Sequence, residues 1–242
     1  MIMNISVCMA TYNGEQYIKE QLDSVLSQLS ENDEVIISDD SSTDKTIGII
    51  ESYNDNRIKI YENQGFKSPI YNFENAIKMA EGDIIVLADQ DDVWLENKIL
   101  ITREHFKDHY STELLVLDGR LVDKNLNTLE DSIFKRLNSK KGLFKNIIKN
   151  SYLGCNMAFT SDMKEFILPF PKKISMHDVW IGLVFELYGN IHFIEKVTLL
   201  HRRHNQTSTK AKYSLIQKIS WRLFNIVSLI HLLIRKLLDE KL

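Results

Sequence analysis

Three carboxylates crowd one short stretch of the chain, "VLADQDDVW" at residues 86–94, where an apolar run ends in Asp89, Asp91 and Asp92. Like charges this close repel one another, so a fold keeps them together only where water covers them or a cation lies among them. Carboxylate oxygens suit Mg²⁺ or Mn²⁺, and an ion held by one or two carboxylates keeps positions open for phosphate oxygens. The stretch therefore predicts a metal–diphosphate site, with a solvated acidic loop as the alternative.

The elements that must position these acids lie in the first hundred residues. Apolar runs predict strands at 5–10, 33–40, 57–61 and 82–89, with helical patterns between them. Crossovers of that length place helices on a parallel sheet, and ligands of such sheets bind beyond the carboxyl ends of the strands. Those ends carry Thr11, Tyr12 and Asn13, then Asp39 and Asp40, then the acidic stretch. The topology therefore predicts that these polar residues converge on one edge.

The second half of the chain is less regular. Residues 113–130 predict a strand and a hairpin-like segment, 176–189 a helix, and 191–209 a strand pair followed by a basic loop. Residues 211–242 are rich in Leu and Ile, with Lys and Arg interspersed, and predict an amphipathic helical tail. The apolar part of this tail is too short to span a bilayer. We expect it either to lie against a membrane surface or to pack on its own domain or a second copy.

Bulk composition excludes several classes of protein. The 242 residues suit one α/β domain, alone or with an appendage, and the net charge of −3 argues against a nucleic-acid partner. Two cysteines in apolar runs, Cys8 and Cys155, indicate a reducing compartment rather than a disulfide framework. The first residues lack a signal-peptide pattern. We therefore expect a cytoplasmic protein, with peripheral contact to the inner face of the plasma membrane as an extension of that expectation.

Six segments, in this order and spacing, resemble the family 2 glycosyltransferases of the GT-A fold: "SVCMATYNGEQYIKEQLDSVLSQ", "DEVIISDDSSTDKT", "ADQDDVW", "GCNMAF", "HDVW" and "HRRHNQTST". Within that family they look most like bacterial rhamnosyltransferase-type enzymes of surface polysaccharide assembly. The resemblance implies an α/β, Rossmann-like, mostly parallel central sheet flanked by helices, with a C-terminal helical tail. It implies a GT-A domain at 1–210, divided into a nucleotide-binding half (1–100) and an acceptor-binding half (101–210), and the tail at 211–242.

The resemblance assigns a nucleotide site and a metal site. It places Asp39 against the pyrimidine base, where a carboxylate accepts the ring N–H of uracil or thymine, and Asp89 on the ribose or sugar side. It implies Mn²⁺ or Mg²⁺ as the cofactor. The ligands implied for that ion are Asp91, Asp92 and His204, and the remaining residues of the nucleotide pocket are Thr11, Tyr12, Asn13 and Glu15.

The resemblance also assigns Asp178 as the catalytic base. An acceptor hydroxyl is a poor nucleophile until its proton is being removed, and displacement with inversion needs the base on the face opposite the leaving nucleotide. An N-terminal helix cap is the structural alternative for Asp178, and both roles can hold together. His177 takes a place where an acid is commoner in the family, so its role stays open.

Four further residues are expected around the diphosphate and the acceptor. Arg202 and Arg203 in "HRRHN" supply positive charge for the departing diphosphate, with an exposed basic loop as the alternative. Gly154 in "GCNMAF" is expected on the acceptor side, where it permits close backbone approach. Trp94 lies beside the acids, and we favour core packing over sugar stacking for its ring.

The function implied is an inverting hexosyltransferase. It would move a sugar, rhamnose in the first instance, from a dTDP- or UDP-linked donor to a glycan or lipid-linked acceptor in bacterial polysaccharide synthesis, acting alone or as a homodimer. One alternative is a non-catalytic nucleotide-sugar-binding or membrane-scaffold protein on the same fold. Another is a metal-dependent phosphatase of the haloacid dehalogenase type with Asp89 as nucleophile, although that motif normally opens a chain and here three β-α units precede it.

Overall fold

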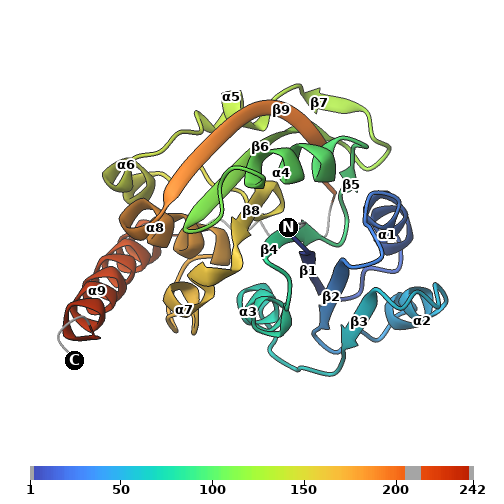
Figure 1. The fold of residues 1–242 in the computed structure, drawn as a ribbon, viewed down its shortest axis with the longest axis horizontal. Coiled ribbons are helices and arrows are strands. Elements are labelled where there is room, and N and C mark those ends of the chain that lie inside the picture. Colours follow the sequence, from blue (N-terminus) through green and yellow to red (C-terminus); the bar gives the residue numbers. More distant parts are fainter. Residues whose placement is uncertain (1–2, 205–213, 240–242) are drawn as a thin grey trace.

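The computed structural model describes residues 3–204 and 214–239 (Figure 1). Its first half alternates strands and helices: β1 (Ile5–Thr11), α1 (Ile18–Leu26), β2 (Glu34–Asp39), α2 (Thr46–Glu51), β3 (Ile58–Tyr61), α3 (Pro69–Met79) and β4 (Ile84–Asp89). The four strands expected here from the sequence are present. The sequences of β1, β2 and β4 are continuous apolar runs because these strands are buried on both faces.

The pairing of β1 explains why polar residues gather at one edge. β1 pairs in parallel with β2 on one side and with β4 on the other, and β2 pairs in parallel with β3. Thr11 lies opposite Asp39, and Ala10 lies opposite Asp89. Three strands therefore end at the same level, and the predicted convergence of their polar ends is confirmed.

The second half completes one sheet around this parallel core. Its elements are β5 (Val93–Trp94), α4 (Lys98–Phe106), β6 (Glu113–Val122), β7 (Thr128–Glu130), α5 (Ile133–Leu137), α6 (Leu143–Ile148), the 3-10 turn η1 (Gly154–Asn156), β8 (Met157–Thr160), the 3-10 turn η2 (Ser161–Met163), α7 (Lys164–Ile167), α8 (His177–Tyr188) and β9 (Asn190–Arg202). The strand order is β3-β2-β1-β4-β8-β6-β9-β5, with β7 on β6. β8 runs antiparallel between β4 and β6, and β9 runs parallel to β6. Most paired residues lie in parallel pairs, as expected.

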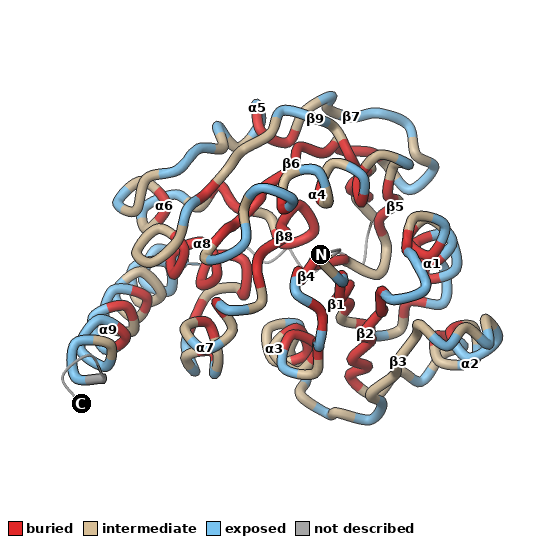
Figure 2. The backbone as a smooth tube through the Cα atoms, viewed as in Figure 1, coloured by how far each residue is buried: buried red, intermediate tan, exposed pale blue. Residues whose placement is uncertain are grey.

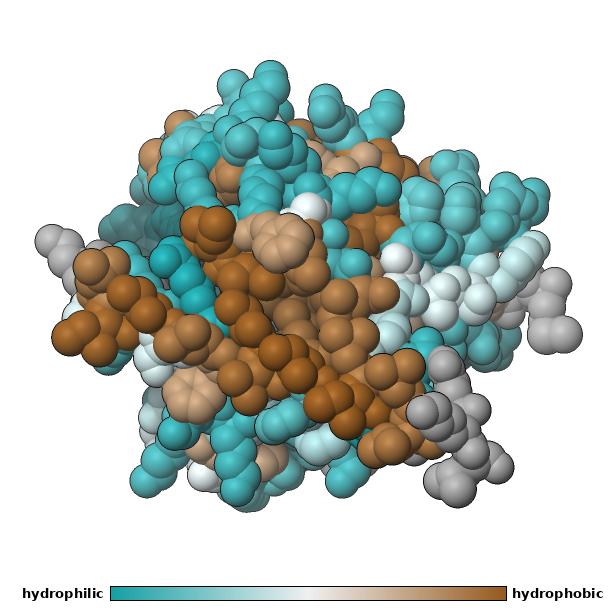
Figure 3. Space-filling model, turned by 90° about the vertical axis from the view of Figure 1, so that its left-hand side faces the viewer, coloured by the Kyte–Doolittle hydropathy of each residue, from teal (hydrophilic) through white to brown (hydrophobic). Residues whose placement is uncertain are grey.

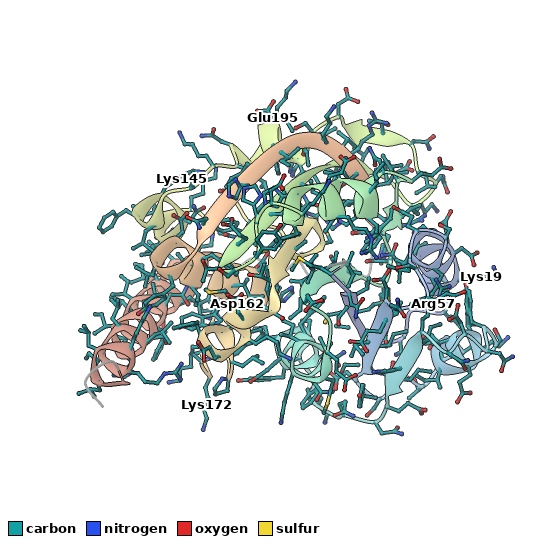
Figure 4. All side chains as sticks on the ribbon, viewed as in Figure 1. Lys19, Arg57, Lys145, Asp162, Lys172 and Glu195 are labelled. Carbon is teal, nitrogen blue, oxygen red and sulfur yellow. The ribbon has the colours of Figure 1, made fainter. Side chains whose placement is uncertain are left out.

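The strand pair predicted within 191–209 is wrong for the described part of that segment, which is the single long strand β9. The polar residues Glu195 and Lys196 resemble a turn in the sequence. In the structure they lie in a bulge, because Leu117 of β6 pairs with Ile194 while the next residue, Asp118, pairs with Val197. A bulge inserts extra residues and bends a strand without ending it. Glu195 accordingly points away from the sheet on the outer side of the curved strand (Figure 4).

Two apolar layers cover the two faces of the sheet, and the buried segments concentrate between sheet and helices (Figure 2). Side chains alternate along a strand, so Val7 and Met9 of β1 face one layer while Cys8 faces the other. The first layer packs against α1, α2 and α4. The second packs against α3 and α8, and the amino end of α8 therefore lies beside the sheet.

The tail helix α9 (Leu215–Asp239) packs on α8 and α6 and buries Asn225, Leu229 and Leu232. Much of its remaining surface is apolar, and Figure 3 shows a continuous apolar band on this side of the molecule. Among the residues that the structure describes, no helix combines the length and apolar character needed to cross a bilayer. More of the large apolar residues of α9 are therefore exposed than buried.

Candidate active site

Asp39 ends β2 almost fully buried, with three hydrogen bonds to its carboxylate. Its Oδ2 accepts from Thr11 Oγ1 at 2.7 Å and from Ser42 Oγ at 2.6 Å, and its Oδ1 accepts from the Ser42 N–H at 2.7 Å. A carboxylate oxygen can accept two hydrogen bonds, so Oδ1 keeps capacity for another donor. The hydrogen bond from Thr11 therefore helps to fix the orientation of the Asp39 carboxylate.

The loop after β1 is fastened to the loop after β2. Asn13 Oδ1 accepts from the Thr43 N–H at 2.8 Å, and Glu15 Oε2 accepts from the Lys45 N–H at 3.0 Å. Asn13 has φ of +47°, a left-handed conformation that Asn tolerates better than most residues. Tyr12 is 56% exposed. Asn13 and Glu15 thus shape the loop, while Tyr12 offers an exposed aromatic ring.

Gln90, between the predicted site acids, joins the ends of β1 and β4. Its Oε1 accepts from the Tyr12 N–H at 2.9 Å, and its Nε2 donates to the Tyr12 carbonyl at 3.0 Å. A Cβ on Gly14 would lie 2.4 Å from Gln90 Oε1. The glycine in "TYNG" is therefore needed to admit the Gln90 amide, and this amide sets the distance between the two loops.

Asp89 and Asp91 are the two carboxyl groups of the acidic stretch whose pKa is raised. Burial, together with the carboxylates of Asp92 and Asp91, raises the pKa of Asp89 to about 8. Burial and Asp92 also raise the pKa of Asp91, which lies 2.6 Å from Nε2 of His204. The predicted pair Asp91 and His204 is thus brought together. These carboxylates ionise readily only when positive charge is supplied.

Asp92 has a different set of partners. It is fully buried, and its Oδ1 lies 3.0 Å from Nδ1 of His201 and accepts from the Arg202 N–H at 3.0 Å. Burial alone would raise the pKa of Asp92, but His201 and these hydrogen bonds outweigh burial and lower it. Groups of the protein itself, His201 and the Arg202 N–H, therefore stabilise the negative charge of Asp92. These contacts connect the acidic stretch to the end of β9.

Arg202 holds the backbone of the acidic stretch through a hydrogen bond to Asp91. Its Nε donates to the Asp91 carbonyl at 2.8 Å, its Nη1 donates to the Lys124 carbonyl at 2.9 Å, and its Nη2 pairs with the Glu20 carboxylate. Only 3% of the residue is exposed. Arg202 could contact a diphosphate only by leaving these three partners. The next residue, Arg203, is half-buried and lies closer to solvent than Arg202.

Lys98 is buried beneath the acids. Its Nζ donates to the Cys155 carbonyl at 2.6 Å and lies 4.8 Å from the ring centroid of Trp94. Burial lowers the pKa of Lys98 to about 8, against the opposing pull of Cys155, Asp92 and Asp89. Trp94 itself is buried in the core, so the structure supports packing rather than sugar stacking for this ring.

Asp178 lies in the first turn of α8 at the same edge of the sheet. The helix cap is Met176, and Asp178 Oδ1 accepts from the Val179 N–H at 2.7 Å. Burial raises the pKa of Asp178 to about 7, although the N–H groups of Val179 and Gly154 favour its ionised form. Asp178 also contributes to the raised pKa of Asp89, which places the two carboxylates in one electrostatic environment.

His177 is packed between an aromatic ring and a glycine. Its imidazole stacks on Phe73 with ring centroids 4.0 Å apart, and a Cβ on Gly154 would lie 2.6 Å from its Nε2. Burial lowers the pKa of His177 to about 3, so the ring is neutral. Among the described residues neither ring nitrogen has a hydrogen-bond partner. A buried polar group without a partner indicates that a ligand or water completes the site.

Several residues of the site were given no role from the sequence, although Asp40 was expected at this edge. They are Asp40, which accepts hydrogen bonds from the loop before α3, and Gln90, Lys98 and His201. Gln90 lies inside the quoted acidic motif, and His201 lies inside "HRRHN", so both were adjacent to assigned positions. Lys98 gives no local signal, because a lysine four residues after Trp94 reads as a solvent-exposed helix residue.

The residues present fit a divalent cation. Asp91 and His204, whose Oδ2 and Nε2 atoms lie 2.6 Å apart, offer a carboxylate oxygen and an imidazole, which suit Mn²⁺ and Mg²⁺. Burial and the neighbouring carboxylates raise the pKa of Asp89 and of Asp91, so a bound cation would favour the ionised form of both. Asp89 and Asp92 also lie within 4.8 Å of Cys155 and His201, in a deeper group of potential ligands.

Comparison with known proteins matches residues 6–165 to the family model described as glycosyl transferase family 2. The Escherichia coli protein WfgD, named as a UDP-Glc:alpha-D-GlcNAc-diphosphoundecaprenol beta-1,3-glucosyltransferase, is 25% identical over 187 residues, covering 74% of this chain and 69% of that protein. The putative teichuronic acid biosynthesis glycosyltransferase TuaG of Bacillus subtilis is 23% identical over 240 residues, covering 94% and 89%.

A similar solved structure is that of residues 1–349 of TarS from S. aureus in complex with UDP. The TM-score is 0.72 at 25% identity, and the match covers 93% of this chain and 65% of that chain. The chain thus spans slightly less than two thirds of this TarS fragment. At 93% coverage, the likeness extends past residue 165, where the family match ends.

Proposed function

The chain belongs to glycosyl transferase family 2, and we propose that it transfers a sugar from a nucleotide-diphosphate donor to a hydroxyl, with inversion at the anomeric carbon. Family membership sets aside the haloacid dehalogenase phosphatase. The observation that carries the proposal is the meeting of two kinds of carboxylate at one sheet edge. Asp91 lies against His204, burial and neighbouring carboxylates raise the pKa of Asp89 and of Asp91, and Asp178 is buried close by.

Asp178 is the proposed base. With a pKa raised to about 7, its carboxylate is ionised in a useful fraction at neutral pH and still binds a proton well, which are the two properties a general base needs. The neutral His177 beside it offers two unpartnered nitrogens to acceptor hydroxyls. Gly154 leaves room for the imidazole, because a side chain at this position would displace the ring.

The donor side is proposed to lie across β1, β2 and β4. Asp39 accepts the ring N–H of the pyrimidine, and the exposed Tyr12 packs against the base. When bound at Asp91 and His204, a divalent ion would supply charge to offset the negative charge of the departing diphosphate. Arg202 is proposed as a positioning residue that holds the Asp91 backbone, and Arg203 as the cation nearer to the phosphates.

For the donor we now favour a UDP-linked hexose over dTDP-rhamnose. The name of WfgD specifies UDP-Glc, and the TarS structure holds UDP. Neither supports rhamnose. Uracil and thymine present the same ring N–H to Asp39, so that contact accepts both nucleotides, and any preference must come from the thymine methyl group and the ribose.

For the acceptor we propose a lipid-linked glycan, reached while the enzyme lies on a membrane. Arg222 Nη2 donates to the Ile148 carbonyl and fixes α9 beside α6. Lys140, Lys141 and Lys149 are exposed near α6 and favour an anionic bilayer. Lys172 points into solvent beside α7 (Figure 4). The exposed apolar residues of this surface are Phe144, Ile148, Leu215, Ile216, Ile219, Leu223, Ile226, Val227, Ile230, Leu233, Ile234, Leu237 and Leu238.

Vesicle flotation tests this membrane contact. The chain should float with vesicles of anionic phospholipid and much less with zwitterionic ones. Ile226→Glu with Ile230→Glu should abolish flotation, whereas Leu129→Glu, at an exposed apolar position on β7, should not. A dimer that the same double substitution dissociates, without any vesicle binding, would instead assign this surface to a second copy.

A donor screen tests the proposed activity. UDP-glucose, UDP-N-acetylglucosamine and dTDP-rhamnose are incubated with a lipid-diphosphate-linked sugar acceptor and Mn²⁺, and release of each nucleotide is measured. We expect acceptor-dependent release from a UDP-linked hexose and a product of inverted anomeric configuration. Nucleotide binding without transfer from any donor would favour the non-catalytic alternative.

A further inference from the structure

A second cluster of potential metal ligands lies away from the acids. It consists of His105 in the last turn of α4, His109 just after that helix, and His192 near the start of β9, all partly buried. One ring nitrogen of each lies within 4.8 Å of the others. The His105 and His109 rings stack with centroids 4.3 Å apart, and the His192 ring lies 4.8 Å and 4.9 Å from them.

Two of the three rings have the second partner that metal-binding histidines usually have. Such histidines donate their other ring N–H to a carbonyl or a carboxylate, which fixes the ring and its tautomer. His109 Nδ1 lies 2.8 Å from the His105 carbonyl oxygen, and His192 Nε2 lies 2.8 Å from Glu113 Oε2. Glu113 is itself buried and held by Asn190, whose Nδ2 donates to Oε1 at 2.9 Å. The His105 carbonyl leaves Nε2 of His109 for an ion, and the Glu113 carboxylate, which makes an ion-pair contact of 2.8 Å rather than a well-aligned hydrogen bond, leaves Nδ1 of His192.

The third ring, that of His105, has a ring nitrogen without a hydrogen-bond partner among the described residues. This atom, Nε2, is buried. Burial, followed by the neighbouring charges of His109 and His192, lowers the pKa of His105 to about 4, so its imidazole is neutral. Neutral imidazole is the form that binds metal ions. A stack of three histidines held only by packing would leave this nitrogen unsatisfied.

We propose that His105, His109 and His192 bind a transition-metal ion of the Zn²⁺ class, with Glu113 positioning His192 and water as the remaining ligand. Three imidazoles suit zinc, whose bonds to nitrogen are about 2.0–2.1 Å long. Small side-chain rotations would bring nitrogens already within 4.8 Å of one another onto such an ion.

The location indicates a structural role. Glu113 and Asn190 are the first residues of β6 and β9 and lie opposite each other, whereas Arg202 is at the other end of β9. His192 and Arg202 are separated by ten residues of strand, roughly 33 Å along the chain. The ion would therefore link the end of α4 to the amino ends of β6 and β9, at the edge opposite the acids.

Zinc titration of the full chain tests the site. The acidic stretch can also bind zinc, so every protein carries Asp91→Ala and is stripped with EDTA before ZnCl₂ is added. Asp89, Asp92, Cys155 and His201 remain as potential ligands, so the site is counted as a difference between variants. We expect His109→Asn or His192→Asn to bind one zinc fewer per chain than the control and to lose the rise in melting temperature that this zinc causes, and Glu113→Gln to weaken binding at this site about 10–100-fold. His231→Asn, at an exposed position on α9, is the matched control.

Cobalt substitution separates specific ligation from general effects on folding. Co²⁺ should give the visible absorption of a low-symmetry nitrogen site in the control, and this absorption should vanish in His109→Asn and His192→Asn chains whose metal-free melting temperatures match the control. Zinc stoichiometry and cobalt spectra that these two substitutions leave unchanged would overturn the proposal, as would the absence of zinc binding by the control.

Discussion

The donor side and the acceptor side of the proposed active site solve the problem of buried polar groups in opposite ways. On the donor side, Asp39, Asn13 and Glu15 are bound by hydroxyl and backbone N–H donors of the protein itself. On the acceptor side, neither nitrogen of His177 has a partner in the part of the chain that the structure describes, and Asp178 has a raised pKa. The donor loops are thus preorganised, whereas the acceptor side keeps groups that only a substrate hydroxyl or water can satisfy.

Loss of the proposed base should have the largest effect. Asp178→Asn preserves size and removes the ionisable group, so sugar transfer should fall about 10²- to 10⁴-fold. Nucleotide affinity should stay within about twofold of wild type, because the hydrogen-bond partners of Asp178 are the N–H groups of Val179 and Gly154 rather than the donor loops. Parallel measurement of transfer and of UDP binding checks this. Equal losses in both would contradict the separation of the two sides.

Removal of the Asp39 charge should show the reverse pattern. Asp39→Asn loses charge-assisted hydrogen bonds worth about 1.5–3 kcal/mol, so UDP affinity should fall roughly 10- to 100-fold. Glu51→Gln, an exposed carboxyl at the end of α2, is the control. Calorimetry decides the outcome, and unchanged UDP affinity in Asp39→Asn would remove Asp39 from the nucleotide site.

The acidic limb of the pH profile should report Asp178. The base must be ionised to act, and burial raises its pKa to about 7, so activity should rise with pH through about 7. At pH 6 only about one tenth of Asp178 would be ionised, and transfer should be about tenfold below its plateau. The profile is measured at saturating donor, with UDP affinity determined at each pH. A flat profile between pH 6 and 8 would remove Asp178 as the titrating base.

A change at Gly154 should produce the smallest effect, confined to the acceptor. In Gly154→Ala the added Cβ would meet His177 Nε2 at 2.6 Å, and overpacking of this kind costs about 1–3 kcal/mol. We expect a lower melting temperature and a several-fold higher KM for the acceptor, with the KM for the donor unchanged. Gly48→Ala, where nothing lies within 4 Å, is the matched control. A rise in donor KM alone would refute the acceptor assignment.

The sequence predicts the donor side better than the acceptor side for a physical reason. Strand runs and helical faces are local patterns, and parallel pairing then forces Thr11, Asp39 and Asp89 to one edge. Contacts such as Gln90 with Tyr12, or Asp92 with His201, depend on packing between distant segments. The single strand β9 was missed for the same reason, since only its pairing with β6 shows that Glu195 lies in a bulge. The unpartnered state of His177 is visible only in three dimensions.

The central claim is that the acidic stretch holds a metal–diphosphate. Calorimetric titration with UDP, with and without Mn²⁺, on wild type and Asp91→Ala, tests it most directly. We predict UDP binding that needs Mn²⁺ in the wild type and is abolished in Asp91→Ala. Binding of UDP that is equally tight without metal, or that survives in Asp91→Ala, would contradict the claim.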